Sequence, residues 1–121
     1  MTEQAKALHT FFSSFDLPAF AENTVPEDQD LPYITYRLAE PEWNQKATMY
    51  AQVWYRSRSN EIVNEKAGEI QQAISIGKIL PFDGGCVVLW PETPFSQIMV
   101  DGDVRSAYIN LSINSYHMPG A

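Results

Sequence analysis

The sequence contains one cysteine and two histidines, the residue types that most often supply a nucleophile or a general base. Cys86 could pair as a thiolate with His9 or His117, but no nucleophile motif surrounds it and it stands in the apolar stretch "CVVLW". We therefore predict a buried, inert cysteine. Neither histidine has a partner at metal-ligand spacing, which indicates surface or half-buried histidines. A single cysteine also excludes an intrachain disulfide.

Aspartates next to glycines could bind a hard cation. Asp101 and Asp103 flank Gly102, and Asp83 precedes a glycine pair. No further carboxylate follows at loop spacing, and Asp-Gly is also what tight turns require. The glycines after Asp83 lead into a strand and lack the Lys-Ser/Thr of a phosphate-binding loop. We therefore predict turns here, and no catalytic, cofactor or metal site in the chain.

Three aromatic residues, Tyr50, Trp54 and Tyr108, could form a stacking platform for a ligand or a single-stranded nucleic acid. The same residue types are ordinary strand formers with cross-strand partners. The net charge of −7, from fifteen acidic and eight scattered basic side chains, disfavours nucleic acid. We expect sheet packing for the three aromatics and no direct binding to nucleic acid.

Large apolar residues near predicted turns indicate protein contacts, although they could also fold back onto their own core. Trp43 lies in a turn forced by Pro41, and a second group of apolar residues leads to the Asp-Gly turn. Gly68 falls on the polar face of a predicted helix, where it either permits close approach of another subunit or is simply tolerated. The candidate interface residues are Glu40, Glu42, Trp43, Gly68, Phe95, Ile98 and Met99.

The first half of the chain predicts a helix, a connector and a hairpin. Thr2 can cap a helix whose apolar residues recur at helical spacing. Residues 16–32 contain three prolines and an acidic patch, which makes regular structure unexpected. Two β-like runs, 33–38 and 47–56, are joined by a short connection and form an antiparallel hairpin. The residues expected on the core face of the first helix are Ala5, Leu8, Phe12 and Phe15.

The second half begins with a helix capped by Ser59 and ended by Gly77. An apolar strand at 86–90, ended by prolines, comes next, and a hairpin around Asp101-Gly102 closes the chain. The order αββαβββ predicts a single α+β domain over residues 1–121, with a mainly antiparallel sheet of four to five strands and two helices on one face. The helix stripe consists of Ile62, Val63, Ala67, Ile70, Ala73 and Ile74.

The N-terminus, "MTEQAKALHTFFSSF", has an acidic residue and no apolar stretch of signal-peptide length. The chain also has no run of about 18 apolar residues. We expect a soluble protein that does not bind a membrane.

Several phrases resemble the tail-terminator, or tail-completion, proteins of long-tailed bacteriophages. That family shows a Pro-aromatic strand start, a strand ending in an aromatic followed by polar residues, and a Glu-containing helix with alternating apolar positions. Here "LPYITYRL", "ATMYAQVWYRSRS" and "NEIVNEKAGEIQQAI" follow in this order, and a long "RSAYINLSIN" closes the chain. The corresponding ranges are Pro32 to Leu38, Ala47 to Ser57 and Ser59 to Ile76.

The resemblance implies a structural tail assembly protein that forms a ring, commonly a hexamer, at the head-proximal end of the tail tube. The ring stops tube growth and joins the tail to the head connector, without turnover or a cofactor. Its partners are then itself, the tail tube protein and the head-tail connector protein, in the virion tail and, during assembly, in the host cytoplasm. An acidic ring would repel DNA passing through it. The residues do not separate tail termination from a neighbouring head-completion role.

The alternative is a small ligand-binding or regulatory α+β module. Its pocket would lie between the sheet and the acidic connector, lined by Tyr36, Trp54 and Tyr108. An enzyme is not expected, because no pair of groups has a recognisable catalytic arrangement.

Overall fold

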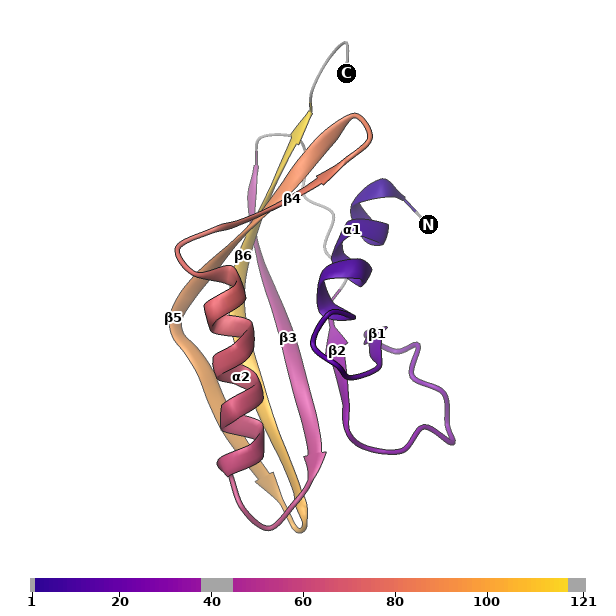
Figure 1. Ribbon diagram of the computed structural model, residues 1–121, viewed down its shortest axis with the longest axis vertical. Helices are drawn as coiled ribbons and strands as arrows, with labels where there is room; N and C mark the ends of the chain where they lie inside the picture. Colours follow the sequence, from indigo (N-terminus) through magenta and orange to yellow (C-terminus); the bar gives the residue numbers. More distant parts are fainter. Residues whose placement is uncertain (1, 38–44, 118–121) are drawn as a thin grey trace.

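The computed structural model describes residues 2–37 and 45–117, which form two helices and six strands (Figure 1). The predicted α+β class is confirmed, but the sheet has six strands instead of four to five, and the order is αβββαβββ. The elements are α1 (Glu3–Phe12), β1 (Ala19–Ala21), β2 (Tyr33–Tyr36), β3 (Lys46–Arg56), α2 (Glu61–Ile74), β4 (Lys78–Phe82), β5 (Gly85–Asp101) and β6 (Val104–His117).

The strands form one sheet in the order β1-β2-β3-β6-β5-β4. Every neighbouring pair is antiparallel except β1 and β2, which are parallel. The predicted pairing of β2 with β3 is confirmed, with Tyr33 opposite Trp54. The long pair β3 and β6 forms the centre of the sheet.

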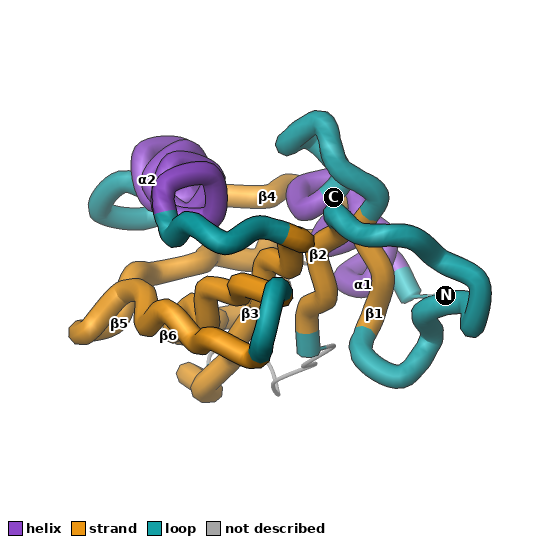
Figure 2. The backbone as a smooth tube through the Cα atoms, turned by 90° about the horizontal axis from the view of Figure 1, so that it is seen from below, coloured by secondary structure: helices purple, strands orange, loops and turns teal. Residues whose placement is uncertain are grey.

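Both helices pack on the same face of the sheet, and the core lies between the two layers. Figure 2 shows α2 lying over β5 and β6 on one side of the sheet. The strands contribute alternate residues to the core, because successive side chains of a strand point to opposite faces. The largest fully buried side chains include Leu8 and Phe12 of α1, Ile70 and Ile74 of α2, and Met49, Leu89, Ile109, Leu111 and Ile113 of the strands.

α1 begins as the sequence predicts. The hydroxyl of Thr2 accepts a hydrogen bond from the N–H of Ala5 at 3.0 Å, which satisfies one of the free donors of the first turn. The predicted core residues Ala5, Leu8, Phe12 and Phe15 are all buried. Neither helix in the described parts of the chain is long and apolar enough to cross a membrane.

α2 differs from its prediction at both ends. Asn60 is the cap residue, although its side chain makes no capping bond, and the Ser59 hydroxyl accepts from the N–H of Glu61 at 3.2 Å. The helix ends at Ile74, where Ser75 adopts a φ of 53°, so Gly77 does not supply the positive φ at the helix end.

The apolar stripe of α2 is narrower than predicted. Val63, Ala67, Ile70 and Ile74 are buried, but Ile62 is 43% exposed. Adjacent residues of a helix point about 100° apart, so a helix that buries Val63 turns Ile62 toward the edge of its contact.

Two short strands are absent from the sequence prediction. β1 lies in the segment expected to be irregular, and it is held by bonds to β2: the N–H of Ile34 donates to Pro18 O and the N–H of Glu22 donates to Tyr36 O, both at 2.8 Å. β4 contains Pro81, which argues against a central strand, and it lies at the edge of the sheet, where a missing N–H is tolerated.

β5 continues through the prolines that we expected to end it. Its pairing with β6 shifts register between Pro91 and Ser96, so that residues 92–95 face only Asn110. The side-chain amide of Asn110 donates to Pro94 O at 2.8 Å and ties the irregular segment to β6. The expected two strands are therefore one strand with a bulge.

The Asp-Gly hairpin is confirmed, one residue later than expected. Asp101 pairs with Val104, so the two-residue loop consists of Gly102 and Asp103. Gly102 has a φ of 59°, and glycine in the first loop position is typical of a type II′ turn.

Candidate functional site

The two faces of the sheet differ in what covers them. Alternate residues of β3 make this plain: Met49, Ala51 and Val53 are buried under the helices, while the intervening residues point to the other side. We call this other side the open face. Its central side chains are Tyr33 and Thr35 of β2, Tyr50, Gln52 and Trp54 of β3, Gln97 and Met99 of β5, and Ser106, Tyr108, Asn110, Ser112 and Asn114 of β6.

Aromatic rings occupy one end of the open face. The rings of Tyr50 and Tyr108 stack with centroids 4.9 Å apart and an interplanar angle of 20°. The ring centroid of Tyr33 lies 6.5 Å from that of Trp54 and 6.0 Å from that of Phe20, and the Tyr33 and Phe20 rings are nearly perpendicular. These residues therefore pack against one another across the strands, as predicted, but they do so outside the core and remain partly exposed.

The polar atoms of these aromatics are held in place. The indole N–H of Trp54 donates to Thr35 Oγ1 at 3.0 Å, and the Tyr50 hydroxyl donates to Glu22 Oε2. The hydrogen bond to Glu22 and the burial of the ring raise the pKa of Tyr50, so its hydroxyl stays protonated at neutral pH. The guanidinium carbon of Arg37 lies 5.8 Å from the centre of the Tyr50 ring.

A depression of about 380 Å³ lies between this aromatic end and the segment that follows β1. Glu22, Tyr33, Tyr50 and Trp54 are among the residues that line it. The sequence predicted a pocket in this region lined by Tyr36, Trp54 and Tyr108, and of these three residues Trp54 lines the depression. Tyr36 is 2% exposed and faces the helices, where its hydroxyl lies 3.0 Å from His9 Nδ1, so it cannot share a pocket with Trp54.

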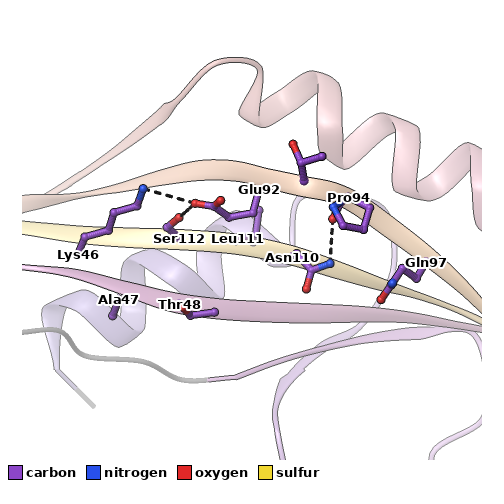
Figure 3. A pocket seen from close by; sticks show the side chains of 10 residues that line it. Lys46, Ala47, Thr48, Glu92, Pro94, Gln97, Asn110, Leu111 and Ser112 are labelled. Atoms are coloured by element: carbon purple, nitrogen blue, oxygen red, sulfur yellow. Dashed lines mark hydrogen bonds and ion pairs between the residues drawn. The ribbon is translucent and has the colours of Figure 1, made fainter.

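A second, polar cleft of about 640 Å³ lies at the bulge of β5 (Figure 3). Lys46 Nζ is 3.4 Å from Glu92 Oε1, and the Ser112 hydroxyl donates to the same carboxylate. The hydrogen bond from Ser112 and the charge of Lys46 hold the pKa of Glu92 below its ordinary value. A carboxylate with a lowered pKa is a poor general base, so this pair is not arranged to activate Ser112 as a nucleophile.

The opposite end of the open face carries apolar groups that the sequence analysis did not single out. Ile79 of the edge strand β4 is 63% exposed, and Trp90 is partly exposed. A methyl group on Gly77 would lie 2.7 Å from the Trp90 ring, so the ring packs directly against the backbone of this glycine. The run "CVVLW" was interpreted only as an apolar strand, so the sequence did not mark Trp90 as an exposed residue.

The predicted interface residues have different positions in the structure. Met99 is 52% exposed on the open face, whereas Phe95 and Ile98 pack partly against the core. All three lie on β5, not on a loop. Gly68 is exposed on α2, with no atom within 4 Å of the point that a Cβ would occupy. Glu40, Glu42 and Trp43 lie outside the described residues.

The remaining candidate groups do not form a reactive cluster in the described part of the chain. Cys86 is buried and free, as predicted, and Asp83 with Gly84 forms the turn between β4 and β5. Within residues 2–37 and 45–117, no group of three or more His, Cys, Asp or Glu side chains could hold a metal ion.

No protein-family model matches this sequence, and no curated protein matches it. A solved structure, whose name states no function, is similar over 95% of this chain and 94% of its own, with a TM-score of 0.65. The sequence identity is 16%, so this likeness concerns the fold alone.

Proposed function

We propose that this chain is a structural protein of a phage tail, a ring-forming terminator that ends the tail tube and joins it to the head connector. It acts by binding other proteins, without turnover. Its partners are further copies of itself, in a ring that is commonly a hexamer, the tail tube protein and the head-tail connector protein. The proposed location of the protein is the tail of the virion, and the tail is assembled in the host cytoplasm.

The open face carries this proposal. It combines partly exposed aromatic rings, the exposed thioether of Met99 and the exposed side chain of Ile79 on one uncovered side of the sheet. Aromatic residues and methionine are enriched at protein interfaces. Such a surface suits a protein that works through contacts with neighbours, and the phrases shared with tail-terminator proteins suggest which neighbours these are.

The direct test is the mass of the purified protein, measured by light scattering at high concentration and in the presence of purified tail tubes. We expect a closed ring in solution or on the tube end, seen by electron microscopy. A chain that stays monomeric in solution and also leaves tail tubes uncapped would contradict the proposal.

A matched pair of variants tests whether the open face carries the contact. Met99→Glu places a charge on the open face, and Ile62→Glu places the same charge on an exposed residue of the helix layer. An unpaired charge buried at an interface is costly, so we expect Met99→Glu to lower the association constant by about tenfold or more. Ile62→Glu should leave it unchanged, and equal effects would assign the contact elsewhere.

A small ligand-binding or regulatory module is the second candidate, and the depression beside Glu22 favours it. A ligand that binds only the folded state raises the unfolding temperature. Thermal unfolding in the presence of mixed metabolites therefore tests this candidate, and the absence of any shift would leave it without support.

A further inference from the structure

The depression beside Glu22 has a fixed acidic group at its edge. Glu22 directly follows β1, and its backbone N–H donates to Tyr36 O at 2.8 Å, which holds the residue against the sheet. Its carboxylate oxygen Oε2 accepts a hydrogen bond from the hydroxyl of Tyr50. An ionised carboxylate has about four acceptor positions. Among the described residues, Oε1 has no hydrogen-bond donor, so it can accept from a further group.

The segment that leads up to this depression is acidic, and the basic residue that directly follows it, Arg37, lies with its guanidinium carbon 5.8 Å from the centre of the Tyr50 ring. From residue 7 to residue 36 the chain contains no lysine or arginine. The same stretch carries five carboxylates, at Asp16, Glu22, Glu27, Asp28 and Asp30. Among the described residues, no lysine or arginine nitrogen lies within 4.0 Å of the Glu22 carboxylate. This edge of the molecule therefore attracts a cation.

The aromatic walls select the kind of cation. Tyr33 and Trp54 lie side by side with ring centroids 6.5 Å apart, and both line the depression. A cation over an aromatic face is stabilised by the ring, most strongly by tryptophan. A guanidinium is planar and stacks on such rings while its N–H groups reach a carboxylate, which an ammonium cannot do in the same way. Within the molecule, the guanidinium of Arg37 already lies over the ring of Tyr50, with 5.8 Å between its carbon and the ring centre.

We propose that this depression binds the arginine side chain of a protein that assembles with this chain, with Glu22 pairing with the guanidinium and Tyr33 and Trp54 contacting its plane. The inference rests on the proposed function for the source of the arginine. The binding itself depends only on the depression, and it is therefore tested without any partner protein.

The probe is N-acetyl-arginine amide, and its neutral, nearly isosteric control is N-acetyl-citrulline amide. Both are titrated into uniformly ¹⁵N-labelled protein at constant ionic strength, with the indole N–H of Trp54 and the backbone N–H of Tyr33 as reporters. We expect saturable shifts at these reporters with the arginine probe and none with the citrulline probe. Equal shifts with both probes, or no saturable shift with arginine, would overturn the inference.

Two glutamine variants separate a specific site from general attraction to an acidic protein. Glu22→Gln should weaken the arginine probe about 1.5- to fivefold, the range of an exposed ion pair. Glu92→Gln makes the same change in the other cleft of the open face and should leave the affinity unchanged. If both variants weaken binding equally, the net charge of the protein explains the effect, and the proposal of a specific site at Glu22 is wrong.

Trp54→Leu tests the ring contact, with circular dichroism as the check that the sheet is intact. Loss of the Trp54 ring should weaken binding of the arginine probe about two- to fivefold, as measured from the chemical shift of the Tyr33 N–H. If arginine binds as expected but no ring or capped tube forms, the depression is an arginine site and the tail-terminator proposal fails. If rings form and the arginine probe does not bind, the tail-terminator proposal stands and the arginine site is overturned.

Discussion

The two faces of the sheet are built from the same strands but have opposite physical characters. In β6, Ile109 is fully buried under the helices, while its neighbour Tyr108 is partly exposed on the open face. The covered face gains its stability from dry apolar packing, which depends on shape. The open face is ordered by ring stacking and by hydrogen bonds such as Trp54 to Thr35. The difference indicates that the covered face contributes most of the stability of the fold, and we propose that the open face is the one that binds other proteins.

The largest effect should come from truncating neighbouring residues on the two faces. Ile109→Ala leaves a cavity in the core and should lower the free energy of unfolding by about 2–5 kcal/mol. Tyr108→Ala removes a cross-strand ring contact and should cost only about 1 kcal/mol. Urea unfolding of both variants measures the difference. Similar losses would mean that the open face supports the fold as strongly as the core does.

Gly85, the first residue of β5, offers the next test. A Cβ on Gly85 would lie 2.2 Å from the carbonyl oxygen of Tyr116, a backbone atom that cannot move without disturbing β6. Gly85→Ala should therefore destabilise the protein by about 1–3 kcal/mol or more, as measured by denaturant unfolding. A neutral result would show that the β5–β6 pairing is looser at this end than its register indicates.

Gly68→Ala should have a smaller effect of opposite sign. Gly68 lies inside α2 with open space where a Cβ would be, so alanine should stabilise the free subunit by about 0.5–1 kcal/mol. Thermal unfolding measures this gain, and light scattering measures assembly of the same variant. A more stable subunit that assembles less well would place Gly68 at a close contact between subunits, whereas unchanged assembly would keep the contact on the open face.

The smallest expected effect is a pH dependence at the polar cleft. The pKa of Glu92 is lowered in the folded protein, first by Ser112 and then by Lys46. A carboxylate with a lowered folded pKa stabilises the fold above its unfolded pKa, and this contribution disappears as the pH falls through the folded pKa. Glu92→Gln should therefore be slightly less stable than the parent at pH 7 and equal to it near pH 2. A difference that persists unchanged in acid would exclude titration of Glu92 as its cause.

The elements that could be predicted are those with strong local patterns. The cap at Thr2, the buried residues of α1 and the pairing of β2 with β3 follow from short-range spacing and were found as expected. β1 and β4 were missed because a strand of three to five residues has too few positions for a period, and its pairing depends on a distant partner. The prolines of β5 were misread because a bulge absorbs them without ending the strand.

The sequence identified the aromatic residues of the candidate site but did not predict on which face of the sheet they lie. Tyr50, Trp54 and Tyr108 were singled out from sequence, and the structure places all three on the open face. Glu22 was missed, because it lies 28 positions before Tyr50 in a segment that was expected to be irregular. No local pattern marks a carboxylate that meets a tyrosine only after β1 has paired with β2.

Alternation along the strands, a property of the sequence alone, determined which side chains share a face of the sheet, because the side-chain period of a strand is two. It could not determine how completely each face would be covered. That depended on where α1, α2 and β1 pack, which is a balance of many non-local contacts. The tertiary structure therefore decided that both helices cover one face, and that Glu22 lies beside the partly exposed rings of the other.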